Sequence, residues 1–125
     1  MRILYIHVPK CGGTSFGAAL RLMHPLSQAG IDLERARDAV RRVRPDLSGR
    51  ALIRAEYRSR RAQLDGHLLT GRRVVSGHVQ LDDDLLEHDD LRVVTLLREP
   101  VERFVSHYRY LQRRHPDPSR PATLD

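Results

Sequence analysis

An apolar run that leads directly into a glycine pair constrains this chain more than any other feature. Residues 3–8 form a short, largely β-branched and apolar segment, which is typical of a strand buried on both faces. Gly12 and Gly13 follow, and Thr14 or Ser15 can cap a helix that starts there. A strand, a glycine turn and a helix in this order predict the first βα unit of a parallel sheet.

The rest of the chain continues this alternation of strands and helices. Apolar residues at helical spacing predict helices over residues 33–43, 51–64 and 101–114. Short apolar runs predict strands over residues 73–76 and 91–97. Apolar strands that alternate with helices indicate an α/β layer fold with a parallel sheet.

Charge narrows the class of partner. The chain has 22 basic and 16 acidic residues, a net charge of +6, and Lys10 is its only lysine. The Arg-rich helices over residues 33–64 suit an acidic acceptor, although arginines more often form a solvated helix face. Aromatic residues are not interleaved with these arginines, which disfavours nucleic acid as a partner.

Cysteine content and hydropathy indicate where the protein acts. Cys11 is the only cysteine, which excludes an internal disulfide and a multi-cysteine zinc cluster and favours a reducing compartment. The apolar runs are too short to span a membrane, and the first residues do not have the pattern of a signal peptide. We therefore expect a cytoplasmic protein whose residues 1–125 form one domain.

The loop over residues 9–15 has the composition of an anion site. A helix start offers unpaired N–H groups and a partial positive charge, and glycine lets the backbone approach a phosphate closely. Lys10 adds a point charge, and Thr14 and Ser15 add hydroxyl donors. Lys10 precedes both glycines, whereas the lysine of nucleoside triphosphatase loops follows the last glycine. A tight turn with a surface lysine is the alternative interpretation.

The segment His7-Val8-Pro9-Lys10-Cys11-Gly12-Gly13-Thr14-Ser15-Phe16 resembles the 5′-phosphosulfate loop of sulfotransferases that use 3′-phosphoadenosine 5′-phosphosulfate. The likeness is to the branch with heparan sulfate 2-O-sulfotransferases and bacterial relatives. It implies a P-loop-like three-layer fold. It also implies that the donor is bound by the loop residues Lys10, Cys11, Gly12, Gly13, Thr14 and Ser15. Lys10 would in addition act in catalysis, and the reaction would need no metal ion.

A second segment, residues 97–110, resembles the 3′-phosphate motif of the same family. There an Arg at a strand end and a Ser eight residues later, here Arg98 and Ser106, hold the nucleotide's 3′-phosphate. The family usually has Asp where Glu99 stands. A planar guanidinium at the carboxyl end of a strand suits a phosphate monoester. The alternative is that Arg98 pairs with Glu99 or Glu102 on an ordinary solvated face.

Sulfuryl transfer to a hydroxyl acceptor also needs a group that removes the acceptor's proton, and histidine is suited to this. His78 follows a short predicted strand, and its Gly-His-Val run resembles the segment with the proposed catalytic histidine of the 2-O-sulfotransferase branch. We therefore predict His78 as the base, with a strand-end histidine held by backbone carbonyls as the alternative. His7 and His107 are interpreted as structural, and Cys11 as filling the loop.

These observations predict a sulfotransferase that acts by in-line displacement, releases 3′,5′-adenosine bisphosphate and takes a hydroxyl acceptor such as an acidic carbohydrate. The resembled family's domains are longer, so we expect residues 1–125 to be the N-terminal portion of such a domain, truncated at its C-terminus. Two alternatives stay open. One is an inactive or incomplete nucleotide-binding module, because the resembled family's domains are longer than this chain and residues 121–125 resemble the start of a further helix. The other is a kinase-like phosphoryl transferase, which needs a Mg²⁺-binding acid near the loop.

Overall fold

A parallel sheet with helices on both faces forms the body of the molecule. In this computed structural model, which describes residues 1–116 and 119, the strands are β1 (Arg2–Ile6), β2 (Gln28–Gly30), β3 (Val74–Gly77) and β4 (Leu91–Thr95). The helices are α1 (Gly13–Met23), α2 (Leu33–Val43), α3 (Gly49–Leu69), α4 (Asp83–Leu86) and α5 (Pro100–Arg114). The strand order is β2-β3-β1-β4, and every pair is parallel.

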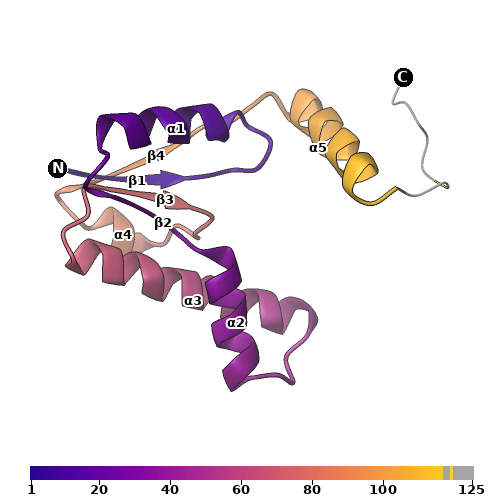
Figure 1. Ribbon diagram of the computed structural model, residues 1–125, viewed down its shortest axis with the longest axis horizontal. Coiled ribbons are helices and arrows are strands. Elements are labelled where there is room, and N and C mark those ends of the chain that lie inside the picture. The colour runs from indigo at the N-terminus through magenta and orange to yellow at the C-terminus, as the bar shows by residue number, and fades with distance from the viewer. Residues whose placement is uncertain (117–118, 120–125) are drawn as a thin grey trace.

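The layers confirm the predicted α/β fold. α1 covers one face of the sheet, and α3 and α4 cover the other (Figure 1). α2 packs on α3 rather than on the sheet. α5 lies beyond the end toward which the β1 arrow points, apart from the two helical layers (Figure 1).

The central strand β1 alternates its side chains between two cores. Leu4 belongs to the larger core, on the side of α3 and α4, which also holds Leu64, Val75 and Leu85 among its fully buried members. Tyr5 belongs to the smaller core, on the side of α1, with Leu20 and Val74. Burial on both faces explains why β1 is apolar from Ile3 to Ile6 instead of alternating with polar residues.

Strand register places three loops at one edge of the sheet. Ile6 at the end of β1 lies opposite Gly77 of β3 and Thr95 of β4. Because the strands are parallel, the chain leaves all three at the same edge, where open α/β sheets bind their ligands. The segments that follow contain Lys10, His78 and Arg98 respectively, the residues that the sequence singles out.

Several element boundaries differ from the sequence prediction. β2 was not predicted, because a three-residue strand carries too little pattern to stand out. α3 runs to Leu69 instead of stopping at residue 64, since Leu68 adds a buried contact at its end. α1 begins at Gly13 with Gly12 as its N-cap, so neither Thr14 nor Ser15 caps it.

The helices bury less than their apolar spacing indicates. None of the α5 side chains is buried, and Val101 and Phe104 are 67% and 62% exposed. In α1 the packed positions include Gly17 and Leu20, whereas Met23 is 72% exposed. The prediction that residues 121–125 resemble a helix start lies outside the described residues.

Candidate functional site

The loop between β1 and α1 reverses direction through two residues with left-handed backbone. Lys10 has φ of 66° and is the one non-glycine residue with positive φ among the described residues. Gly12 has φ of 78° and serves as the N-cap of α1. Left-handed backbone suits glycine but costs energy for lysine. The loop therefore holds its one cation in a strained conformation, which is common at functional sites.

Gly13 is required because the space above it is occupied. A Cβ on Gly13 would lie 2.3 Å from the Tyr5 hydroxyl oxygen and 2.5 Å from His7 Cδ2. Tyr5 lies near the end of β1 and His7 directly after it, so the first turn of α1 packs against both side chains. This close approach brings the N-terminus of α1 against the carboxyl edge of the sheet.

The start of α1 has the features of an anion site. Its first turn carries no acidic residue, so nothing in it offsets the partial positive charge of the helix N-terminus. Thr14 and Ser15 are exposed there, as the predicted hydroxyl donors. Cys11 is 8% exposed, and its thiol lies 3.7 Å from the Pro9 carbonyl oxygen, which agrees with a loop-filling role.

Two contacts join this loop to α5. The Lys10 ammonium lies 4.7 Å from the centre of the Tyr110 ring, a cation–π distance. The Arg103 Nε donates to the Pro9 carbonyl oxygen at 3.1 Å. The first and second sequence motifs, nearly a hundred residues apart, therefore meet in the folded chain.

Arg98, just before α5, and Ser106 of α5 line the same cavity. This cavity of about 470 Å³ is also lined by five other residues of α5, Val101, Glu102, Val105, Arg109 and Arg113. Arg98 donates through Nε to Glu102 at 2.9 Å, which is the ion pair that the alternative interpretation named. The cavity contains three arginines and one carboxylate, so it favours an anion.

Glu99 begins α5. Its carboxylate accepts from the backbone N–H groups of Val101 and Glu102 at 3.1 and 2.7 Å, and these bonds lower the pKa of Glu99. Pro100 occupies the first turn, where its missing N–H leaves no bond unmade. The acid at this position orients the helix start rather than pairing with Arg98.

His78 lies half-buried at the end of β3, with its ring stacked on His7. The ring centroids are 4.7 Å apart and the ring planes differ by 18°. Burial is the main cause that lowers the pKa of His78, and the charges of His7 and Arg60 lower it further. A histidine that stays unprotonated near neutral pH can accept a proton.

The structure corrects the interpretation of His7. It lies just past β1, at the same edge as His78, instead of within the strand. Both rings border two cavities, one of about 370 Å³ with Tyr57 and Arg60 of α3, and one of about 220 Å³ with Thr14 of α1. Their proximity follows from the register of β1 and β3, which no local pattern of the sequence specifies.

The predicted site residues form two groups within the described chain. Lys10 contacts α5 through Tyr110, on the helix that also carries Ser106. His78 borders other cavities than the one that Arg98 and Ser106 line. The structure thus brings the loop into contact with α5, and Thr14 of α1 and His78 line one cavity. It does not place Arg98 and His78 in one cavity.

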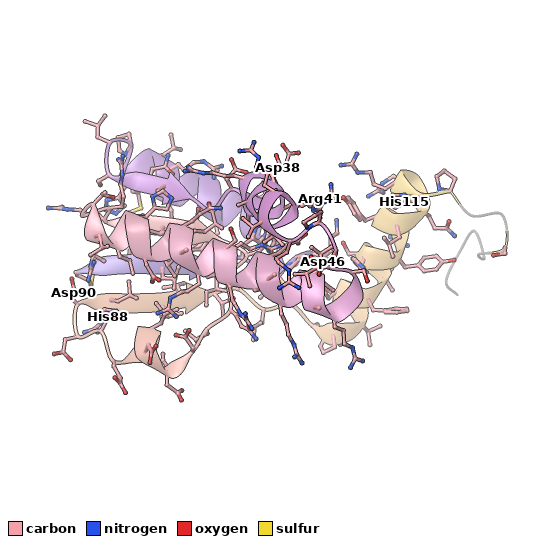
Figure 2. The ribbon with its side chains drawn as sticks, turned by 90° about the horizontal axis from the view of Figure 1, so that it is seen from below. Asp38, Arg41, Asp46, His88, Asp90 and His115 are labelled. Carbon is pink, nitrogen blue, oxygen red and sulfur yellow. The ribbon has the colours of Figure 1, made fainter. Side chains whose placement is uncertain are left out.

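A buried acid organises part of the Arg-rich surface. Glu56 of α3 is 6% exposed and accepts from Arg60 at 3.3 Å and from Arg37 of α2 at 3.2 Å. Other charged side chains of α2, such as Arg41, project outward (Figure 2). The arginines of α2 and α3 are therefore divided between an internal ion-pair network and a solvated face.

The described part of the chain contains neither a membrane-spanning helix nor a cluster of metal-binding side chains. Among residues 1–116 and 119, no helix is long and apolar enough to cross a membrane. Within the same residues, no three His, Cys, Asp or Glu side chains gather as they would around a metal ion.

Comparison with known proteins agrees with this geometry. The model of the sulfotransferase family matches residues 1–122. No curated protein and no solved structure matches the chain significantly. The family match spans the glycine loop, the His7–His78 edge and the whole of α5, and on this basis the chain belongs to the sulfotransferase family and is a transferase.

Proposed function

We propose that this protein transfers a sulfuryl group from 3′-phosphoadenosine 5′-phosphosulfate to a hydroxyl group of an acceptor. The observation that carries the proposal is the loop at the start of α1. It combines a helix N-terminus without a first-turn acid, a lysine with left-handed backbone, and contacts to α5. Membership of the family supports sulfuryl transfer in general.

Each group has a task in this proposal. Lys10 and the N–H groups at the start of α1 stabilise the charge on the transferring group and on the departing phosphate. Arg98 and Ser106 bind the 3′-phosphate, and the guanidinium has further N–H donors besides the one that it gives to Glu102. The acceptor oxygen bonds to sulfur while the sulfur–oxygen bond to the donor breaks, and His78 takes the hydroxyl proton.

The acceptor in this proposal is a carbohydrate with acidic groups. The cavity beside His78 is bordered by Arg60 and Tyr57. The neighbouring cavity of about 330 Å³ adds Arg54 and Arg58, whereas its Arg61 pairs with Asp82 of the same cavity. Cations next to the proposed base favour a negatively charged acceptor. The branch with heparan sulfate 2-O-sulfotransferases and bacterial relatives is the one that this acceptor would suit.

Calorimetry with 3′,5′-adenosine bisphosphate tests the donor site. We expect the wild type to bind the bisphosphate, and Lys10→Ala and Arg98→Ala each to weaken binding roughly 10- to 100-fold, since a hydrogen bond to a charged group contributes about 1.5–3 kcal/mol. Arg41→Ala, an exposed arginine of α2 (Figure 2), serves as the matched control and should bind as the wild type does.

The same titrations separate the two alternatives. Preference for ATP with Mg²⁺ over the bisphosphate would contradict the proposal and favour a kinase-like transferase. Bisphosphate binding without turnover of the sulfated donor on any hydroxyl acceptor would favour a nucleotide-binding module. Turnover that is unchanged in His78→Ala would remove His78 from the role of base.

A further inference from the structure

We propose that His7 is a positioning residue for His78, which holds the His78 ring by stacking and disfavours a second positive charge beside its own ring. This inference deepens the proposed function, because it concerns the group that would accept the acceptor's proton. It starts from the juxtaposition of the two imidazoles at the carboxyl edge of the sheet.

The backbone brings the two residues together. β1 and β3 are neighbours, with Ile6 opposite Gly77, so the next residues of each strand are His7 and His78. The His7 N–H donates to the Gly77 carbonyl oxygen at 2.9 Å and extends the ladder by one bond. The stacked geometry, 4.7 Å between centroids at 18°, is therefore built into strand pairing and does not depend on a mobile loop.

The His7 ring is itself supported from below. It stacks on the Tyr5 ring with centroids 6.0 Å apart and planes at 19°, and Tyr5 is 1% exposed. Gly13 leaves the space that the His7 ring fills, because a Cβ there would lie 2.7 Å from His7 Nε2. The His7 ring thus contacts both His78 and Tyr5, and Tyr5 is fixed in the core.

Two imidazole rings whose centroids are 4.7 Å apart do not both accept a proton easily. Like charges at this separation repel, and more strongly when the rings are half-buried than in open water. A positive charge on His7 therefore disfavours protonation of His78, whose pKa the charge of His7 lowers. A protonated His7 can in this way keep His78 in the form that accepts a proton.

The other charges around the pair act in the same direction. On the α3 side, Arg60 donates from Nη1 to the His78 carbonyl oxygen at 3.4 Å. On the α1 side, Arg21 borders the cavity of about 220 Å³ that His7 and His78 also line. The nearby acid, Glu56, is engaged by Arg60 and Arg37. Burial, His7 and Arg60 lower the pKa of His78, and a hydrogen bond to the His7 backbone opposes them.

Nuclear magnetic resonance of the histidine Cε1–H groups tests this in the unliganded protein. We expect the midpoint of the His78 titration to move upward in His7→Phe, which keeps a flat ring for stacking but cannot carry charge. His88→Phe is the control, because His88 is exposed and lies at the end of the molecule opposite α5 (Figure 2). It should leave the His78 midpoint unchanged, and His78→Gln assigns the resonance.

A His78 midpoint that is the same in folded His7→Phe and in the wild type would overturn the inference. If His7→Phe does not fold, His7→Gln, which cannot carry a charge either, is titrated in its place. An unchanged His78 midpoint in folded His7→Gln would then overturn the inference. Bisphosphate calorimetry is a separate measurement, so the loss of the coupling and the loss of the donor site can be told apart.

Discussion

At the scale of single residues, the site depends on what lies beneath the loop as much as on the loop. Gly13 has no side chain because the Tyr5 hydroxyl and the His7 ring fill that space. The Tyr5 hydroxyl is buried and has no hydrogen-bond partner among the described residues, and burial raises its pKa, so it stays uncharged. A substitution at Gly13 should therefore alter the structure of both the anion loop and the histidine pair.

Gly13→Ala should destabilise the protein by about 1–3 kcal/mol, the usual cost of overpacking, and should abolish bisphosphate binding as the helix start is pushed off the sheet edge. Urea denaturation and calorimetry measure the two effects. Gly66→Ala is the matched control, since a Cβ on Gly66 in α3 meets nothing within 4 Å. It should increase stability by about 0.5–1 kcal/mol. Equal effects of the two substitutions would contradict the packing argument.

The sequence predicted most of the candidate site residues from signals that are local. A glycine pair after an apolar run, or an arginine at a strand end, is visible within a few residues. His7 was interpreted as structural because nothing in its own neighbourhood distinguishes it from a strand residue. Its proximity to His78 depends on the pairing of β1 with β3, which involves residues far apart in the chain.

At the scale of elements, α5 connects the two motifs while burying none of its side chains. It contacts the loop through Arg103 and Tyr110, and its first turn is held by Glu99. Because tertiary packing does not bury this helix, its start should depend on the cap more than a packed helix does. The family's usual Asp at this position can make the same bonds.

Glu99→Ala should speed amide hydrogen exchange in the first turn of α5, at Val101 and Glu102, because their N–H groups lose the carboxylate. Glu99→Asp should retain protection. Hydrogen bonds to these amides lower the pKa of Glu99, so in the wild type the protection should persist below the ordinary pKa of glutamate and disappear at still lower pH. Exchange measured by mass spectrometry or resonance tests this. Unchanged exchange in Glu99→Ala would show that the cap is not what holds the helix start.

At the scale of the whole molecule, stability and the candidate base are coupled through pH. Folding places His78 where its pKa is below the ordinary value for histidine, chiefly through burial. The unfolded chain binds this proton near pH 6.5, whereas the folded chain binds it only at lower pH. Where the unfolded state holds more protons, stability rises with pH.

The free energy of unfolding should therefore fall as the pH is lowered from about 7 through the ordinary histidine pKa, until the folded protein also takes up the proton. His78→Gln should flatten this decrease, because glutamine does not titrate. Urea denaturation at a series of pH values provides the measurement, and His88→Gln, an exposed histidine, provides the control. A slope in His78→Gln as steep as that of the wild type would contradict the link between His78 burial and stability.

The sequence alone predicted the fold class, which the structure confirms, and the candidate anion loop and Arg98–Ser106 motif, because apolar runs, glycines and caps act through neighbours in the chain. Only the tertiary structure decided which side chains meet. The stacking of His7 on His78, the contact of Lys10 with Tyr110, and the burial of Glu56 all join distant segments. Such contacts follow from strand order and register, which no local pattern specifies.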